Sequence, residues 1–206
     1  MEKGFTITYE YGGNLYVNTT NRCDYNCNFC LRHNGNGGSI YTDNLWLTRE
    51  PTKEEILASI ESWDLTKYQQ LVFCGFGEPS YRFDDICWVI DQLKEKGKKI
   101  FTRMDTNGTG SLIHGRDIAP EFAGRFDMVS VSLNTDTAEK YEALCHPQLP
   151  GSYQAMKDFT KEVRQYVPQV MMSVVDTISP EEIEACRKIC EEEIGAVYRV
   201  REYIED

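Results

Sequence analysis

The chain has 206 residues, with 22 Lys and Arg against 33 Asp and Glu and a formal net charge of −11. With 41% hydrophobic and 27% charged residues, it has the composition of a folded globular protein rather than a disordered chain. The acidic balance argues against a nucleic-acid partner, and no apolar run reaches the ~18 residues of a membrane span. Residues 1–13 lack the apolar stretch of a signal peptide. We therefore expect one cytoplasmic domain over residues 1–206 and no membrane partner.

The elements begin with two alternating segments, 5–9 and 15–19, which flank a Gly-Gly-Asn turn and predict a β-hairpin. Apolar runs predict five further strands, at 70–76, 99–104, 127–133, 169–175 and 196–201. Helical patterns separate these strands, and most have a recognisable start or stop. The expected helix signals are the capping box Thr52 and Glu55, the apolar stripe 86–93 stopped by Gly97, the cap Ser152, and Ser179-Pro180 with Glu182.

This alternation of strands and helices predicts a parallel sheet with helices outside it. Six strand–helix units need about 180 residues when scaled from the eight-unit barrel. We therefore predict an α/β fold, a partial (βα)6 TIM-type barrel with an N-terminal β-hairpin. A doubly wound open sheet is the alternative. Both folds place the working site at the carboxyl ends of the strands.

Three of the eight cysteines, Cys23, Cys27 and Cys30, lie just past the first strand of the predicted barrel. Three thiolates can hold three irons of a four-iron cluster and leave the fourth iron open, and an open metal position implies chemistry. His33 follows Cys30 at a C-x2-H spacing, so a Cys3His zinc site is the alternative. The pair Cys186 and Cys190 continues an apolar helix stripe, which predicts core positions.

The C-x3-C-x2-C spacing, with Phe29 before the last cysteine, resembles the signature of the radical S-adenosylmethionine (SAM) superfamily. After the next strand, the sequence GFGEP (75–79) is similar to the Gly-Gly-Glu-Pro motif of that family. The sequence DTNG (105–108) resembles its Thr-Asn-Gly turn, and VSVSLNTD (129–136) resembles its ribose-contacting strand. The matches cover nearly the whole chain as one core domain. The short length, with the segments LWLTREPTKEEI and YRVREY, looks most like the small TatD-associated radical SAM group.

The resemblance implies that the three thiols bind a [4Fe-4S] cluster whose open iron is chelated by the amino and carboxylate groups of SAM. An electron from a reductant such as flavodoxin or ferredoxin then cleaves the sulfonium. The resulting 5′-deoxyadenosyl radical abstracts hydrogen from a substrate.

Several residues are candidates for placing SAM. Glycine at 75 and 77 lets the end of the second strand approach a ligand closely. Main-chain carbonyls there are expected to accept hydrogen bonds from the SAM ammonium group. Glu78 is expected to add negative charge. Period-two alternation puts Ser130, Ser132 and Asn134 on one face, which suits ribose hydroxyls and the SAM carboxylate, with a wet edge strand as the alternative. The cofactor-binding candidates are Phe29, Gly75, Gly77, Glu78, Asn107, Ser130, Ser132, Asn134 and Arg201.

For two of these candidates a structural interpretation competes. Asn107 lies in an Asn-Gly turn, which can account for it without a ligand. Arg201 shares a face with Arg199 and is a candidate for a SAM or substrate carboxylate, because arginine grips carboxylates with two hydrogen bonds, but a solvated face is the alternative. Cys74, at the active-site end of the second strand, is the catalytic candidate, either as a hydrogen-atom donor or as a substrate-facing thiol.

The long Gly- and Asn-rich loop 32–50 is predicted to cover the cluster or to shape the substrate pocket. The function these signals favour is a radical SAM enzyme acting on a small molecule, with the reaction type open. One alternative is an activase that installs a glycyl radical in a partner protein. The other is a zinc-stabilised binding module without turnover.

Overall fold

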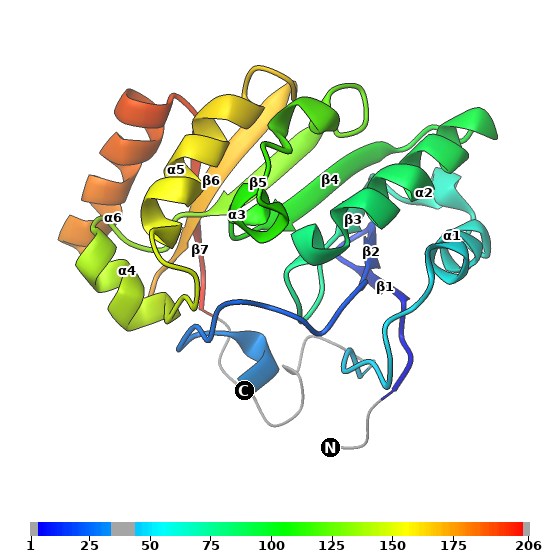
Figure 1. Ribbon diagram of the computed structural model, residues 1–206, viewed down its shortest axis with the longest axis horizontal. Coiled ribbons are helices and arrows are strands. Elements are labelled where there is room, and N and C mark those ends of the chain that lie inside the picture. The colour runs from blue at the N-terminus through cyan, green and yellow to red at the C-terminus, as the bar shows by residue number, and fades with distance from the viewer. Residues whose placement is uncertain (1–3, 34–43, 204–206) are drawn as a thin grey trace.

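The structure is a computed structural model, and it describes residues 4–33 and 44–203. In this part of the chain one seven-stranded sheet runs in the sequential order β1 to β7 (Figure 1). β1 and β2 pair antiparallel as the predicted hairpin, and every later neighbouring pair is parallel. The strands are β1 (Thr8–Tyr11), β2 (Asn14–Val17), β3 (Gln70–Phe73), β4 (Phe101–Thr106), β5 (Met128–Ser132), β6 (Gln169–Val175) and β7 (Val197–Arg201).

Helical segments connect the parallel strands and lie along one side of the sheet in Figure 1. The α-helices are α1 (Lys53–Glu61), α2 (Phe83–Glu95), α3 (Gly110–His114), α4 (Ala138–Cys145), α5 (Ser152–Val163) and α6 (Pro180–Lys188), and α6 continues as the π-helical segment η5 (Ile189–Ile194). The 3-10 segments are η1 (Leu31–His33), η2 (Leu65–Lys67), η3 (Pro79–Arg82) and η4 (Ala119–Phe122). None of the helices formed by the described residues is long and apolar enough to cross a membrane.

The order of the strands decides between the two predicted folds. A doubly wound sheet reverses its strand order at a switch point and carries helices on both faces, whereas this order runs from β1 to β7 without reversal. Within the described residues β7 does not pair with β1, so the barrel is open. The predicted partial barrel with an N-terminal hairpin is therefore confirmed, and the doubly wound alternative is wrong.

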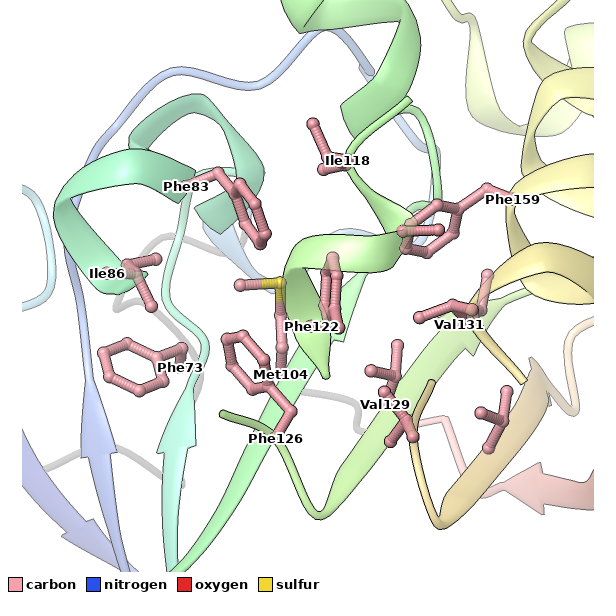
Figure 2. Packing of buried hydrophobic residues seen from close by; sticks show 14 of the residues in the cluster. Phe73, Phe83, Ile86, Met104, Ile118, Phe122, Phe126, Val129, Val131 and Phe159 are labelled. Carbon is pink, nitrogen blue, oxygen red and sulfur yellow. The ribbon is translucent and has the colours of Figure 1, made fainter. Parts of the chain in front are cut away.

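The core lies between the outward face of the sheet and the helices. Figure 2 shows Met104, Val129 and Val131 from the strands pointing toward the rings of Phe122 and Phe126, and all five side chains are at most 2% exposed. The Phe122 ring lies with its centroid 4.8 Å from that of Phe126. Burying each such side chain contributes about 1.5–3 kcal/mol, so this side of the sheet is the main source of stability.

The predicted helix starts are mostly confirmed. Thr52 Oγ1 accepts a hydrogen bond from the Glu55 amide, and the Glu55 carboxylate accepts one from the Thr52 amide. The same capping box forms at the start of α6. The predicted cap at Ser152 is wrong, because Gly151, with φ +75°, is the N-cap and Ser152 is already helical. The Ser152 hydroxyl donates instead to the carbonyl of Leu149.

Two short helices, α3 and α4, are absent from the sequence prediction. α4 has eight residues, of which only Tyr141 and Cys145 are buried, so its apolar periodicity is weak. Its one local signal is Thr137, whose hydroxyl accepts from the Lys140 amide. α4 ends at His146, whose φ is +46°. This helix matters below because the cysteine loop is anchored to it.

Candidate active site

A cavity of about 270 Å³ opens at the carboxyl ends of the parallel strands. The structure brings all the residues proposed from the sequence to this one cavity. Its wall includes Cys23, Cys27, Phe29, Cys30, Cys74, Gly75, Gly77, Glu78, Asn107, Ser130, Ser132, Asn134 and Arg201. These residues come from loops and strands between residue 23 and residue 201, so the fold rather than local sequence gathers them.

The cysteine loop after β2 is held in place by the last turn of α4. The Asn26 amide donates to the Cys145 carbonyl and the Asn28 amide donates to the Leu144 carbonyl, each at 3.0 Å. The three cysteines of this loop are half-buried and form no disulfide. Arg32 closes the loop by donating from Nη2 to the Tyr25 carbonyl at 2.6 Å. The loop therefore presents three free thiols to the cavity.

Burial makes these thiols reluctant to ionise on their own. It raises the pKa of Cys23 to about 12, with the charge of Glu78 adding to the shift, and it raises the pKa of Cys30. The pKa of Cys27 rises because its thiol hydrogen-bonds that of Cys145 and because it is buried. Arg32 acts in the opposite direction on all three pKa values. Since coordination deprotonates a thiol outright, a bound metal group offsets this cost, and the donor set fits one.

A single metal ion does not fit the same residues. Within residues 4–33 and 44–203 no three His, Cys, Asp or Glu side chains are placed to hold one ion. A zinc site needs its ligands to converge to about 2.0–2.3 Å from one point, so the Cys3His alternative with His33 is not favoured. A four-iron cluster takes one thiol on each of three irons, which requires no such convergence.

The two glycines of the GFGEP turn are required for close packing within the protein. A Cβ on Gly75 would lie 2.1 Å from Oδ1 of Asn18, and one on Gly77 would lie 2.3 Å from the Thr20 carbonyl oxygen. Both glycines therefore allow close packing against the segment that follows β2, and their role in the approach of a ligand stays a prediction. Their backbones still line the cavity, so the turn presents main-chain groups to it.

Glu78 is a structural tie rather than a free charge. Its side chain is buried, at 4% exposure. Its carboxylate accepts from the Ser80 amide at 3.0 Å, from Thr106 Oγ1 at 2.7 Å and from the Asn107 amide at 2.7 Å. Burial raises its pKa, and these hydrogen bonds act against that shift. Glu78 thus has a positioning role, because both oxygens serve the turns after β3 and β4, and the expectation that it supplies charge to a ligand stays a prediction.

Asn107 continues this network toward the cysteine loop. Its Nδ2 donates to Asp24 Oδ1 at 3.0 Å, and its Oδ1 accepts from the Thr109 amide at 3.0 Å and from the Thr109 hydroxyl at 2.6 Å. Three of the four hydrogen-bonding positions of the side chain are taken by protein partners, as the turn interpretation expects, and one N–H of Nδ2 has no hydrogen-bond partner among the described residues. Asp24 was missed by the sequence analysis, although it lies between the first two cysteines of the loop. Burial raises the pKa of Asp24, and its hydrogen bonds to Asn107 and Thr109 lower it.

The inward face of β5 behaves as the period-two pattern predicts. Ser130 and Ser132 line the cavity, and Asn134 follows in the left-handed region with φ +65°. Asn134 Nδ2 donates to Cys145 Sγ at 3.3 Å. Its Oδ1 is buried and has no hydrogen-bond partner among the described residues. Because an unsatisfied buried acceptor costs about 1–3 kcal/mol, this oxygen on the cavity wall fits the hydroxyl or ammonium of a ligand such as SAM.

The deeper wall holds an ion pair that the sequence analysis missed. Arg103 Nε and Nη2 donate to the two carboxylate oxygens of Asp105 at 2.6 and 2.8 Å, and both residues line the cavity. Alternation along β4 is the signal that would have found them. Cys74 lies on the same wall, and burial raises the pKa of its thiol well above the usual range. The Cys74 thiol is therefore neutral around pH 7.

Of the long loop 32–50, residues 34–43 lie outside the described residues. The part from 44 onward packs against the segment before the cysteines, since Asn18 Nδ2 donates to the Leu45 carbonyl and Asn21 Nδ2 to the Leu47 carbonyl, each at 2.8 Å. Glu50 pairs with Arg22 at 2.7 Å. None of residues 44–50 lines the cavity. This portion braces the chain between β2 and the thiols, and a covering role for 34–43 remains a prediction.

The structure is an open parallel barrel. At its mouth, three cysteines and the polar face of β5 surround one cavity, and this arrangement is typical of an α/β enzyme that holds an iron–sulfur group. Residues 17–190 match the family model described as "Radical SAM superfamily". The chain therefore belongs to the radical SAM superfamily, whose members are enzymes that use a [4Fe-4S] cluster and SAM. No curated protein matches the sequence.

Solved structures share the fold at low sequence identity. SuiB of Streptococcus suis bound to SAM superposes with a TM-score of 0.65 at 17% identity, over 93% of this chain and 40% of SuiB. Native anSMEcpe with bound AdoMet gives 0.62 at 16%, over 92% of this chain and 51% of that protein. Methylornithine synthase (PylB) gives 0.57 at 14%, over 91% and 52%. The chain thus spans about half or less of the length of these relatives.

Proposed function

We propose that this chain is a cytoplasmic radical SAM enzyme acting on a small molecule, with residues 1–206 forming its single core domain. The observation that carries the proposal is the convergence of three free thiols, the GFGEP turn and the polar face of β5 on one cavity. When bound and reduced, the cluster supplies one electron to the sulfonium of SAM, which yields methionine and a 5′-deoxyadenosyl radical that abstracts hydrogen from the substrate.

In this proposal the cysteine loop holds three irons through Cys23, Cys27 and Cys30. The backbone bonds to α4 keep the thiols aimed at the cavity, and Arg32 favours their ionised form. Phe29, which is partly buried against the core beside the last cysteine, shields the thiols from water.

The strand ends hold SAM. Main-chain carbonyls of residues 75–77 accept hydrogen bonds from its ammonium group. Ser130, Ser132 and Asn134 contact its ribose and carboxylate, and the unsatisfied Asn134 Oδ1 accepts from a ribose hydroxyl. Glu78 fixes the turns around SAM and adds charge beside it, and Asn107, which is held by Asp24, has one N–H of Nδ2 left for the ligand.

Cys74 is the proposed hydrogen-atom donor. A neutral S–H group gives its hydrogen atom to the substrate radical and becomes a thiyl radical. One electron from the external reductant and one proton restore the thiol. This role agrees with the raised pKa of Cys74, which keeps the hydrogen on sulfur.

Two finer assignments extend the proposal. The electron donor is a flavodoxin or a ferredoxin. The chain belongs to the small TatD-associated group, which the segments LWLTREPTKEEI and YRVREY support.

The test is anaerobic reconstitution of the full chain with iron and sulfide, followed by SAM and dithionite. We expect four irons per chain, a brown protein and release of 5′-deoxyadenosine. The variants C23S, C27S and C30S should each reduce that release to background. C87A is the matched control, because Cys87 lies in α2 and does not line the cavity.

Fewer than four irons, or a colourless protein with stoichiometric zinc, would overturn the proposal. A persistent organic radical on a partner protein would instead identify the chain as a glycyl-radical activase.

A further inference from the structure

Two arginines of the last strand, the exposed Arg199 and the half-buried Arg201, border the cavity without a side-chain partner among the described residues. Arg199 and Arg201 both line it, and in the described part of the chain neither forms an ion pair. Arg201 Nε is buried and has no hydrogen-bond partner there. Arg103, which also lines the cavity, behaves differently, because its Nε and Nη2 donate to the carboxylate of Asp105. Four arginines therefore line the cavity: Arg103 is paired with Asp105, Arg32 donates to the Tyr25 carbonyl, and Arg199 and Arg201 form no ion pair among the described residues.

The position of these arginines separates them from the thiols. Arg199 and Arg201 pair across the sheet with Ser173 and Val175 of β6. They lie two residues apart on one face of β7, which places their Cα atoms about 6.6 Å apart. β7 ends the sheet, whereas the cysteine loop follows β2 near its other end. The two guanidiniums thus form one wall of the cavity, distinct from the wall that carries the cluster site.

Nothing in the described cavity neutralises this wall. Asp105 is already paired, and the carboxylate of Glu78 is enclosed by three hydrogen bonds from the turns. Glu202 also borders the cavity, but among the described residues it forms no ion pair with either arginine. In the proposed scheme SAM lies against the cysteine loop, the GFGEP turn and β5, so its carboxylate is placed away from β7.

We propose that Arg199 and Arg201 bind an oxyanion of the substrate, so that the substrate is a small acidic molecule carrying a carboxylate or a phosphate. This inference rests on the proposed function and names the substrate class for the same site. A guanidinium matches both groups with two parallel hydrogen bonds. The net charge of −11 disfavours anions over the surface as a whole, so binding of an anion at this wall requires a local cationic site.

The test uses the reconstituted holoenzyme with SAM and no reductant, so that no turnover occurs. Calorimetric titrations with succinate and with inorganic phosphate distinguish the two kinds of oxyanion, and succinamide is the neutral control probe. We expect one of the two anions to bind and succinamide not to bind. R199Q and R201Q should each weaken anion binding about tenfold or more, because a hydrogen bond to a charged group contributes about 1.5–3 kcal/mol. R201K, which keeps the charge, should lose less than R201Q.

R187Q is the matched control, because Arg187 lies on α6 and pairs with Glu184 and Glu191 away from the cavity. Its anion affinity should equal that of the unchanged protein. The affinity for SAM should be the same in all variants, and circular dichroism should show the same fold.

Three results would overturn the inference. The first would be that neither anion binds the holoenzyme without substitutions. The second would be that R187Q weakens anion binding as much as R201Q does. The third would be that R201Q weakens SAM binding while leaving anion binding intact, which would assign Arg201 to SAM. In each case the protein without substitutions still holds four irons and releases 5′-deoxyadenosine, so failure of this inference is distinguishable from failure of the proposed function, which removes both.

Discussion

The two faces of the same strands differ in almost every property. On β5, Val129 and Val131 point outward and are 0% exposed against the helices. Ser130 and Ser132 alternate with them and point into the cavity. Other strands repeat the contrast: on β4, Met104 is packed in the outer core, while Arg103 and Asp105 form their ion pair on the inward side. Stability and chemistry are thus assigned to alternate residues of one backbone.

The contrast follows from what each face meets. Helices cover the outward face, so apolar side chains there are buried and stabilise the fold. A closed eight-stranded barrel fills its interior with layers of side chains, but this sheet is open and its inward face borders a cavity of about 270 Å³. Polar groups are tolerated there because they have solvent, each other or a ligand as partners. Changes on the two faces should therefore affect different measurements.

Replacing Glu78 is expected to cause the largest loss of stability. This residue is an exception to the division between the two faces, because it lines the cavity and also holds the fold together. Glu78→Ala leaves the donors of Ser80, Thr106 and Asn107 without their acceptor. At about 1–3 kcal/mol for each unsatisfied group, we expect a loss of about 4 kcal/mol, measured by urea unfolding of the cluster-free protein. A loss below about 1 kcal/mol would show that the network is not needed for folding.

The next effect is expected at Gly77. Gly77→Ala places a methyl group within 2.6 Å of the carbonyl oxygens of Thr20 and Arg22, and backbone atoms cannot move aside as a flexible side chain can. We expect a loss of about 3 kcal/mol, the upper end for overpacking, together with reduced iron loading because the cysteine loop is displaced. Gly97→Ala is the control for iron loading, since no atom lies within 4 Å of that Cβ; its φ of +71° makes alanine cost stability there without displacing the cysteine loop. Unchanged iron content in Gly77→Ala would contradict the packing argument.

Two neighbouring residues of β5, Val131 and Ser132, test the contrast between the outward and inward faces of the sheet. Val131→Ala should cost about 2 kcal/mol of stability, because roughly two buried methyl groups are lost at about 0.8 kcal/mol each and a cavity remains. It should leave the affinity for SAM unchanged. Ser132→Ala should cost under about 0.5 kcal/mol and weaken SAM binding severalfold. Equal effects of the two substitutions on both measurements would break the division between the faces.

The smallest effect is expected far from the cavity. Thr52→Ala removes the cap of α1, which should cost about 1 kcal/mol and lower the melting temperature by roughly 2–4 °C. SAM binding and iron content should not change. If either falls, the start of α1 is coupled to the site through the neighbouring Glu50–Arg22 pair.

Much of the fold could be predicted because its signals are local. The apolar runs gave all the parallel strands to within a few residues, and the capping boxes gave the starts of α1 and α6. The hairpin was found from its glycine turn, although its first strand is 8–11 rather than 5–9. α4 was missed because it buries only one side of two turns.

The sequence predicted which residues belong to the site but not what each side chain does there. Which residues reach the cavity follows from their place at strand ends, and the structure gathers all of them there. What each side chain touches depends on partners distant in sequence. Glu78 looks like a free charge until Thr106 and Asn107 are placed beside it. Asp24 was overlooked for the same reason, since its partners Asn107 and Thr109 lie more than 80 residues away.

The anchoring of the cysteine loop on α4 sets the order in which the protein can be made. The carbonyls of Leu144 and Cys145 that hold the loop lie 116 and 119 residues after Asn28 and Asn26, their partners. A nascent chain leaving the ribosome therefore exposes its three thiols long before their support has been synthesised. Delivery of iron and sulfide to an ordered site must wait until most of the polypeptide has emerged, which makes assembly of the metal group a late step in the maturation of this protein.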